Sequence, residues 1–490
     1  MGKIPPSKVQ EILFGSSDRS ESKRIAVLLK DGLIRKIAPK IYSSNLLDDP
    51  GVIIKRNWFR ILAHLFPEAL LSHRSALEFK PTSSGNIFLT YTYSDKVALP
   101  GLTIRLLKGP AGLDGDNQFF ESLYVSQEPR AFMENLQESR KRGAESKCLS
   151  QAELEEKLEA IIRARGEAGL NTLRDKAREI APVLEMDEEF RKLDALISGL
   201  LSTGKSKSLT SPVAIARSLG EPFDPERITL FENLYETLAG QPYPVLQEGN
   251  PSDNGYRTFA FFEGYFSNYI EGTEFTVSEA KEIVTSETPL PARDEDSHDI
   301  LGTYRMVSSR KEMSVCPTNP DEFLSILRSR HAVLLHARKS KRPGEFKDRN
   351  NRAGNTEFVD HHLVAGTLKK GFEWYMLLKD PFAKAVYMMF LVSEVHPFMD
   401  GNGRIARIMM NAELSSKGLS KIIIPTVYRE DYMGALRKLT RQRISDAYIR
   451  MLLRVYNFSA LLSEDTIDAM EQHLQRLDAF KEPSEGKLRM

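Results

Sequence analysis

The chain has 490 residues, of which 41% are hydrophobic and 28% charged, and its formal net charge is +1. This length suggests about three domains, and the composition is that of a soluble globular protein. A net charge near zero argues against a chain that binds nucleic acid or membranes over its whole surface. The two cysteines, Cys148 and Cys316, are far apart and lack zinc-ligand spacing, so we expect neither a disulfide framework nor a zinc site. No apolar run is long enough to span a membrane and the first ten residues lack an apolar signal segment, so we expect a cytoplasmic protein without membrane contact.

The N-terminal segment is basic. Residues 1–60 contain twelve Lys or Arg residues against six Asp or Glu residues. Residues 9–13 predict a first short helix, residues 20–34 a second helix that ends at a glycine, and residues 35–43 a short β-wing. This order is typical of a winged helix, whose cationic face binds DNA phosphates. A solvated charged surface on a protein–protein module is the alternative, so DNA binding through residues 1–60 stays open.

Residues 85–108 are rich in β-branched and aromatic side chains and predict two or three strands. Together with residues 64–91, they make residues 1–140 resemble the N-terminal region of the abortive-infection antitoxin family of transcriptional regulators. The resemblance implies a DNA-binding regulator and carries no catalytic motif. We therefore interpret His64 and His73 as structural. A gel-shift experiment on residues 1–140 at several salt concentrations would test the regulator hypothesis.

Residues 150–200 predict helices, with charged and apolar residues at helical spacing. The segment Gly199 to Ser206 also satisfies the phosphate-loop pattern G-x-x-x-x-G-K-[ST]. That motif needs a strand before it and a helix after it, whereas an amphipathic helix precedes this one. We therefore predict an ordinary loop, in which Lys205→Ala leaves nucleotide use intact.

Residues 301–460 predict a mainly helical domain. Residues 380–395 form a nearly continuous apolar stretch that begins with Asp380 at a cap position and a proline in the first turn, which predicts a central buried helix. Residues 404–415 predict a second helix with one apolar face. The loop HPFMDGNGR, His396 to Arg404, connects the two helices.

The loop combines the groups that nucleotidyl transfer requires. Pro397 ends the first helix, so the second begins near Asn402, and the N-terminus of a helix attracts anions. The glycines on either side of Asn402 allow a ligand to approach the backbone, and its amide is a candidate donor. Arg404 and Arg407 share one helical face and suit successive phosphates.

Three other side chains of the loop suit specific tasks. Asp400 offers a hard oxygen ligand for Mg²⁺, and Phe398 is expected to point into the core. His396 can accept a proton near neutral pH. Its place at a helix C-terminus should raise its pKa, while nearby arginines should oppose that effect.

His396 to Arg407 match the pattern H-x-F-x-[DE]-G-N-G-R-x-x-R at every position, which resembles the Fic family motif. The resemblance implies a protein adenylyltransferase that moves AMP from ATP to a Ser, Thr or Tyr hydroxyl of a target protein, and of itself. It also implies that His396 is the general base and that Asp400 binds Mg²⁺. Gly401, Asn402 and Gly403 would form the anion site. Arg404 would contact the β-phosphate and Arg407 the γ-phosphate.

Arg342 to Val359 resemble the family's flap, a β-hairpin that covers the site and pairs with the target backbone as an added strand. The implied docking residues are Lys347, Asn350, Asn351 and Gly354, and we expect the turn at Asn350-Asn351. A solvated basic loop is the alternative. We assign no role to the two histidines that follow, at 361 and 362.

SNYIEG, Ser267 to Gly272, matches the family's inhibitory motif [ST]-x-x-x-E-[GN]. Ser267 and Glu271 lie on one helical face, and Glu271 would pair with Arg407 and withdraw the γ-phosphate contact. Thr276 and Glu279 predict a capping box that restarts a helix. In some family members the same glutamate supports removal of AMP, so the direction of the reaction stays open.

Charge also links this segment to the flap. Residues 266–300 carry nine acidic and two basic residues, and residues 328–352 carry nine Lys or Arg residues and two acidic ones. The acidic segment is therefore complementary in charge to the basic flap region.

The predicted fold is therefore multidomain, with a mostly α-helical Fic core, a β-hairpin flap and an α+β winged-helix-like N-terminal region. The predicted parts are 1–140 (antitoxin-like), 150–225 (helical linker), 226–300 (inhibitory helix), 301–460 (Fic catalytic domain) and 461–490 (C-terminal tail). A de-AMPylase and a DNA-binding regulator are the alternatives for function. A homodimer is left open.

Overall fold

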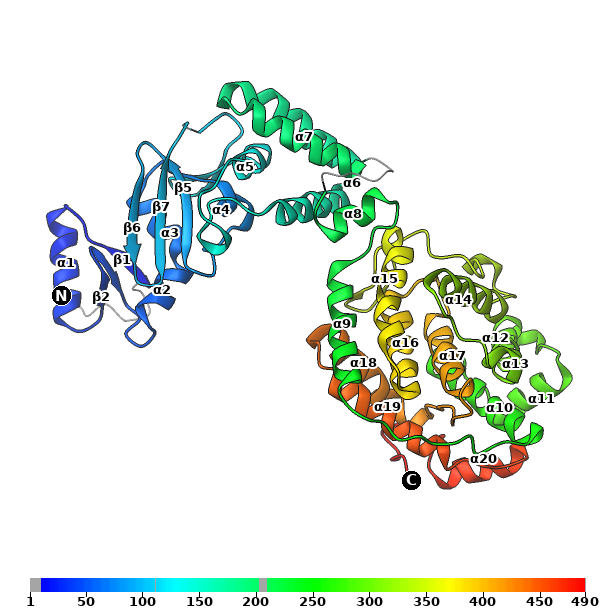
Figure 1. Cartoon of the computed structure of the whole chain (residues 1–490). Helices are drawn as coiled ribbons and strands as arrows, with labels where there is room; N and C mark the ends of the chain where they lie inside the picture. Colours follow the sequence, from blue (N-terminus) through cyan, green and yellow to red (C-terminus); the bar gives the residue numbers. More distant parts are fainter. Residues whose placement is uncertain (1–9, 111, 202–208, 490) are drawn as a thin grey trace. The chain divides into compact units, whose positions relative to one another are not determined.

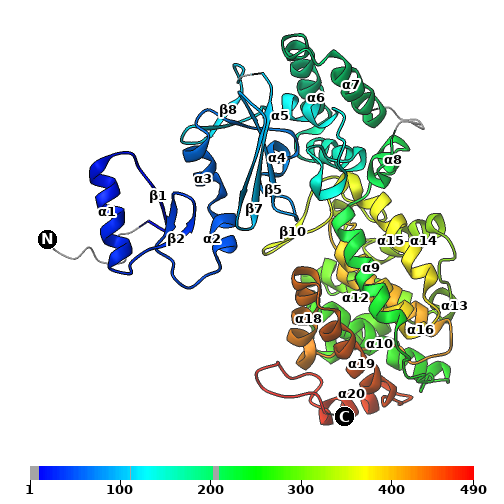
Figure 2. The ribbon, with the colours of Figure 1, turned by 60° about the vertical axis from the view of Figure 1, so that its left-hand side comes forward.

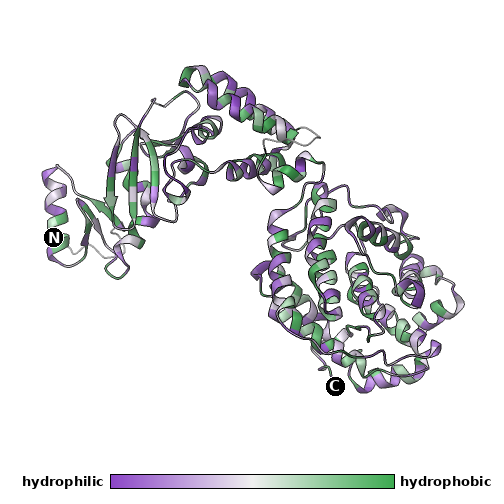
Figure 3. Ribbon diagram, in the orientation of Figure 1, coloured by the Kyte–Doolittle hydropathy of each residue, from purple (hydrophilic) through white to green (hydrophobic). Residues whose placement is uncertain are grey.

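The structure is a computed structural model that describes residues 10–110, 112–201 and 209–489 (Figure 1). The chain divides into two compact units, residues 1–220 and 221–490. The finer boundaries expected from the sequence stay predictions. In both units the helices carry hydrophobic and hydrophilic residues side by side (Figure 3). No helix in the described part of the chain is long and apolar enough to cross a membrane.

The first unit opens with a small three-stranded sheet and one helix. Its elements are β1 (Ile12–Phe14), α1 (Arg19–Lys30), β2 (Arg35–Ala38) and β3 (Ile41–Ser43). The strand order is β1-β3-β2, and both pairings are antiparallel. The hairpin expected as a wing is confirmed, and α1 begins where the Asp18 side chain accepts the N–H groups of Ser20 and Glu21.

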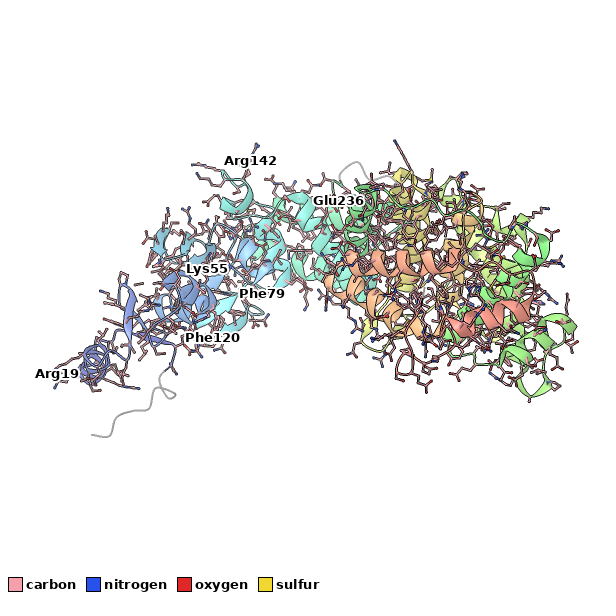
Figure 4. All side chains as sticks on the ribbon, turned by 90° about the horizontal axis from the view of Figure 1, so that it is seen from below. Arg19, Lys55, Phe79, Phe120, Arg142 and Glu236 are labelled. Atoms are coloured by element: carbon pink, nitrogen blue, oxygen red, sulfur yellow. The ribbon has the colours of Figure 1, made fainter. Side chains whose placement is uncertain are left out.

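The first short helix predicted at residues 9–13 is wrong, because its described part runs into strand β1. Ile, Leu and Phe favour a pleated, half-buried strand, and Leu13 pairs with Tyr42. A strand therefore stands where the first helix of a winged helix was expected. The antitoxin resemblance of residues 1–140 stays a prediction. Arg19 and Lys55, labelled in Figure 4, are exposed basic residues of this unit.

A six-stranded sheet forms the centre of the first unit. Its elements are α2 (Pro50–Arg56), α3 (Trp58–Leu65), β4 (Leu70–Leu71), α4 (His73–Glu78), β5 (Asn86–Tyr91), β6 (Asp95–Leu99), β7 (Leu102–Lys108), β8 (Asn117–Phe120), β9 (Leu123–Val125) and α5 (Glu128–Asn135). The order is β6-β7-β5-β4-β9-β8, with β5 parallel to β7 and β4 parallel to β9. The strands expected in residues 85–108 are confirmed as β5, β6 and β7. His73 is buried and contacts Ser72 and Gln137, and the ring of His64 stacks on Phe14 at 3.9 Å, which fits structural roles.

Three helices complete the first unit: α6 (Gln151–Leu184), α7 (Asp187–Leu201) and α8 (Pro212–Ser218). The helices expected at 150–200 are thereby confirmed. Buried Glu155 accepts the backbone N–H groups of Thr210 and Ser211 and so ties α6 to the segment before α8. Gly199 of the phosphate-loop pattern lies inside α7, and Lys205 and Ser206 lie outside the described residues. A helix, not a strand, precedes the pattern, so the context of a phosphate loop is missing.

The second unit is helical. Its helices are α9 (Pro225–Ala239), α10 (Asp253–Ile270), α11 (Val277–Ser286), α12 (Asp294–Val307), α13 (Arg310–Met313), α14 (Pro320–Leu334), α15 (Val364–Leu377), α16 (Pro381–Val395), α17 (Asn402–Ser415), α18 (Arg429–Gln442), α19 (Ser445–Ala460) and α20 (Ile467–Arg476). Helices α9, α15 and α16 pack against one another (Figure 2). The only described hairpin in this unit pairs β10 (Arg352–Ala353) with β11 (Thr356–Glu357). Within the tail expected at 461–490, Met470 and Leu474 of α20 are fully buried in the core of this unit.

Helix α16 is the buried centre of the second unit. Its N-cap Asp380 accepts the N–H of Ala383, and Pro381 occupies the first turn, as predicted. Val386, Met389 and Phe390 are fully buried. This rigid helix ends at His396 and so fixes where the predicted catalytic loop begins.

Candidate active site

The side chain of Asn402 holds the loop between α16 and α17 in its conformation. His396 ends α16 in a left-handed conformation, and Gly401 precedes α17 in the same conformation. The side-chain Oδ1 of Asn402 accepts the Phe398 N–H at 2.8 Å, and its Nδ2 donates to the Phe398 carbonyl at 2.9 Å. Both ends of the amide thus bind the loop itself, so Asn402 holds the loop in shape. That the amide also donates to a ligand through its second N–H stays a prediction, beside the backbone N–H groups of the first turn of α17.

His396 is half-buried, and its ring stacks on Phe358 with 3.7 Å between centroids. Burial lowers its pKa from 6.5 to about 4, against the opposing effect of a contact with the Ser393 carbonyl. Desolvation of the charged ring, which the sequence could not reveal, is thus the largest effect on the pKa of His396. His396 is therefore neutral at physiological pH and can accept a proton.

His331 of α14 contacts two residues of the loop. Its ring stacks on fully buried Phe398 with 3.6 Å between centroids. Its Nδ1 accepts the Gly344 N–H at 2.9 Å, so its Nε2 carries the proton and donates to the Asp400 carbonyl at 3.0 Å. Burial lowers its pKa to about 4, which keeps this tautomer neutral. Sequence reasoning missed His331, because one histidine in an amphipathic helix gives no signal of its own.

Asp400 presents a carboxylate at the start of α17. Its Oδ1 accepts the Gly401 N–H at 2.7 Å and lies 3.6 Å from Arg404 Nη2. Its Oδ2 lies 3.6 Å from Lys341 Nζ, and about a third of the side chain is exposed (36%). An accessible carboxylate beside the N-terminus of a helix suits a divalent cation that also binds phosphate oxygens.

Arg407 is buried and held by α10. Its Nε donates to Ser267 Oγ at 2.9 Å, and its Nη2 donates to Glu271 Oε1 at 2.7 Å. The ion pair expected between Glu271 and Arg407 is therefore present. Burial alone would raise the pKa of Glu271, but Arg407 more than offsets it and holds that pKa below its usual value. Tyr432, whose hydroxyl lies 3.3 Å from Arg407 Nη1, could not be foreseen from the motif.

The Glu271 carboxylate lies directly on the first turn of α17. A Cβ atom at Gly403 would be 2.1 Å from Glu271 Oε1 and 3.1 Å from Arg407 Nη1. Only glycine leaves room for the carboxylate at this point. Glu271 thus occupies the position where the N–H groups of the helix would bind an anion.

Arg404 contacts other residues than Arg407 does. Its Nη1 lies 2.5 Å from Asp299 Oδ2 of α12 and 3.4 Å from Asn268 Oδ1. Its Nε is buried and has no hydrogen-bond partner within the described residues. Asp299 also binds Arg338, so the acidic segment and the basic segment, which are complementary in charge, meet here. The count of charges indicated the complementarity, but it did not identify Asp299.

The flap is a short exposed hairpin whose turn is at Gly354–Asn355. The turn predicted at Asn350-Asn351 is wrong. Gly354, with a φ of +56°, adopts the left-handed conformation more readily, and the two asparagine side chains bind elsewhere. Asn351 Nδ2 donates to the Phe398 carbonyl at 2.9 Å, and Asn350 Nδ2 donates to Asp360 at 2.8 Å.

Lys347 connects the base of the flap to the loop. Its Nζ donates to Asn351 Oδ1 at 2.7 Å, and its backbone N–H donates to the Pro397 carbonyl at 2.8 Å. Burial lowers the pKa of its ammonium to about 8. Three of the four predicted flap residues therefore bind within the protein, to each other, to the loop or to Asp360. Gly354 alone lies at the exposed tip.

A neutral histidine, a carboxylate, a helix N-terminus and two buried arginines lie together at this loop, and such groups suit the binding of a phosphate-containing anion. The Fic/DOC family profile matches residues 323–414. The chain therefore contains a Fic-family domain, as the loop motif predicted.

Known proteins show the same likeness. The "Protein adenylyltransferase Fic" of Nematostella vectensis is 29% identical over 222 residues, which cover 43% of this chain and 48% of the relative. That of Drosophila willistoni is 26% identical over 235 residues, 46% of this chain and 44% of the relative. The chain spans about half the length of the curated relatives it matches. A Fic domain containing signaling protein from Bacteroides thetaiotaomicron aligns with a TM-score of 0.37 and 22% identity, over 50% of this chain and 97% of that one.

Proposed function

We propose that this chain is a protein adenylyltransferase, which moves AMP from ATP to a Ser, Thr or Tyr hydroxyl of a target protein and of itself. We propose further that Glu271 inhibits it. The observation that carries the proposal is the position of Glu271. It lies on the helix N-terminus beside a loop whose histidine, carboxylate and arginines suit the binding of ATP. The names of the curated relatives support the same activity.

The reaction follows from the groups in the loop. The oxygen of the target hydroxyl attacks the α-phosphorus of ATP, and its proton passes to the neutral ring of His396. The bond between the α-phosphorus and the bridging oxygen breaks, and pyrophosphate leaves. The N–H groups at the start of α17 stabilise the negative charge on the phosphates.

Arg404 and Arg407 would bind the β- and γ-phosphates. Asp400 is the residue that would hold Mg²⁺, which neutralises phosphate charge when bound. Its carboxylate is accessible and its nearest charged contacts are at 3.6 Å, so it fits that role. The exposed hairpin β10–β11 would pair with a backbone segment of the target.

Glu271 opposes this reaction in two ways. It occupies Arg407, and it places a negative charge where the γ-phosphate would bind. Its lowered pKa keeps it ionised at neutral pH, so the repulsion persists in the cell. The same ionised carboxylate, 31% exposed, could instead orient a water molecule that removes AMP from a modified protein. De-AMPylation is therefore the second candidate.

The test uses ATP labelled at the α-phosphate, Mg²⁺, and a cell lysate as a source of targets. We expect Glu271→Gly to transfer about 5–150 times more label than wild type, the usual range for coupling between sites. Adding His396→Ala should abolish this transfer. Glu274→Gly, the same change at an exposed acid three residues away, is the matched control and should behave like wild type.

Equal labelling by wild type and Glu271→Gly would exclude the inhibitory role of Glu271. No label with any variant would exclude adenylyl transfer to the proteins tested. A pre-adenylylated protein would then be the substrate, and loss of its label with wild type but not with Glu271→Gly would establish de-AMPylation.

A further inference from the structure

Asp299 of α12 is a buried carboxylate that binds two arginines. Its exposure is 1%, and its Oδ2 lies 2.5 Å from Arg404 Nη1. Both of its oxygens also accept the Nε–H of Arg338 at 3.0 Å. A carboxylate in such a place is stable only because it is paired, and here two cations share it.

The two arginines depend on Asp299 to different degrees. Arg338 has two further partners on the same helix, Glu295 and Asp296, each at 2.9 Å. Arg404 has one other acid in range among the described residues, Asp400, and that contact is longer, 3.6 Å. Asp299 is therefore the partner with the stronger effect on where the Arg404 guanidinium lies.

Asp299 also differs from Glu271 in how it meets its arginine. The side chain of Glu271 is 31% exposed and lies on the anion site, so ATP must displace it. The side chain of Asp299 is 2% exposed and occupies Nη1 of Arg404, while Nε remains without a hydrogen-bond partner among the described residues. A ligand cannot displace an enclosed carboxylate, so the Asp299 contact can persist when a nucleotide binds.

We propose that Asp299 is the positioning residue of the nucleotide site, which fixes Arg404 in the orientation that binds the ATP phosphates. This rests on the proposed function above. An arginine side chain has many rotamers, and binding it in advance on one edge removes the ordering that the nucleotide would otherwise require. The role is one of orientation, since Asp299 does not itself meet the phosphates.

The test must distinguish the loss of Arg404 orientation from the loss of charge balance around a buried carboxylate. Asp299→Asn keeps the shape but leaves buried Arg404 and half-buried Arg338 with less negative charge, and this variant could fail to fold. The double variant Asp299→Asn with Arg338→Gln removes one charge of each sign and so keeps the local balance. It still removes the carboxylate that orients Arg404.

The experiment measures binding of Mg²⁺-ATP by calorimetry, with Glu271→Gly as the parent so that the anion site is open. We expect the double variant to bind ATP about 10–100 times more weakly than the parent, the usual loss when the support of a binding residue is removed. Arg338→Gln alone should stay within about threefold of the parent, because Asp299 still holds Arg404. Asp299→Glu should recover part of the affinity.

Glu263→Gln is the matched structural control. Glu263 is also a buried acid of this unit, and it binds Lys421 Nζ at 2.7 Å. This variant should unfold at a lower temperature than the parent and bind ATP as the parent does. In the labelling assay, the KM for ATP should rise in the double variant and stay unchanged in the control.

A folded double variant that binds ATP as tightly as the parent would overturn the proposal, and so would an equal loss of affinity in Glu263→Gln. Binding is measured without transfer, so the two proposals fail separately. A parent that binds ATP but moves no AMP would contradict the proposed activity and leave the role of Asp299 standing.

Discussion

Each unit of the chain contains a buried arginine that pairs with one or two acids. The acids of the two units differ in how far their side chains are exposed to solvent. In the first unit, Arg130 is fully buried, with Asp116 at 2.7 Å and Glu134 at 2.9 Å. Those carboxylates are only 1% and 2% exposed. In the second unit, Arg407 is also buried, but the side chain of its partner Glu271 is 31% exposed.

The difference separates a structural pair from an exchangeable one. A carboxylate enclosed on all sides cannot be replaced by a ligand, so the Arg130 pairs serve the fold of the first unit. Glu271 is accessible and lies where an anion would bind, so it meets the condition for exchange with a phosphate that we propose. The accessibility of the acid, and not the burial of the arginine, therefore distinguishes the pair that we propose to be functional.

The largest expected effect would come from breaking the enclosed pairs. Arg130→Met leaves two buried carboxylates without their cation and should lower the free energy of unfolding by about 3–5 kcal/mol. Glu271→Gln should cost about 1 kcal/mol or less, because solvent reaches the site and Arg407 keeps its bonds to Ser267.

Tryptophan fluorescence in urea can measure both changes. The chain has two tryptophans, Trp58 in the first unit and Trp374 in the second. Trp374→Phe isolates the signal of the first unit, and Trp58→Phe that of the second. Equal losses for Arg130→Met and Glu271→Gln would refute the distinction between the two kinds of pair.

A smaller effect is expected at Gly403. Gly403→Ala places a methyl group 2.1 Å from Glu271 Oε1, so we expect it to displace the carboxylate and to cost about 1–3 kcal/mol of stability. In the Glu271→Gly background most of this loss should vanish, giving a coupling of about 1–2 kcal/mol in a double-mutant cycle.

Gly434→Ala is the matched control for that cycle. Gly434 lies in α18, and apart from the neighbouring backbone of that helix no atom of the described residues lies within 4 Å of its Cβ position. The alanine should stabilise the helix by about 0.5–1 kcal/mol in either background. Additive behaviour of Gly403→Ala and Glu271→Gly would show that the carboxylate does not occupy this position in solution.

The smallest expected effect concerns pH. The pKa values of His396 and His331 are lowered by burial from 6.5 to about 4. Transfer by Glu271→Gly should therefore stay constant from about pH 5.5 to 7.5, because His396 is neutral throughout. A loss of rate centred near pH 6.5 would show that His396 is solvated and titrates normally.

Stability should respond to pH where the rate does not. Between pH 6.5 and 4 the unfolded chain binds protons that the folded histidines refuse, so the free energy of unfolding falls as the pH is lowered through this window. His331→Gln should reduce this slope. An unchanged slope in that variant would mean that His331 carries no depressed pKa.

Local signals explain what the sequence could predict. The helices on either side of the loop follow from the cap at Asp380, the proline after His396 and the periodicity of apolar residues. The loop motif indicated the candidate site, and the spacing of Ser267 and Glu271 placed both on one helical face. The resemblance to the inhibitory motif implied the contact with Arg407, which is present. The capping box of Thr276 and Glu279 is present for the same local reason.

The errors and omissions have non-local causes. Strand β1 forms because residues 12–14 pair with residues 41–43, which a short window cannot reveal. The pKa of His396 depends on burial by the whole unit. Asp299, His331 and Tyr432 reach the site from three other helices, and no spacing in the sequence links them to the loop.

The position of Glu271 at the end of α10 has a consequence for the resting molecule. Glu271 is the C-cap of the helix, and Gly272 follows with a φ of +90°. The carboxylate can therefore leave Arg407 through torsions of two terminal residues, without unwinding α10. If the arrangement with the Glu271–Arg407 pair formed is favoured by about 2 kcal/mol, it outnumbers the arrangement with the pair broken by about 30 to 1. The pair would then be broken in a few molecules of every hundred at any moment, which would give the proposed AMP transfer a constant basal rate. A partner could raise or lower that rate by acting on these two residues.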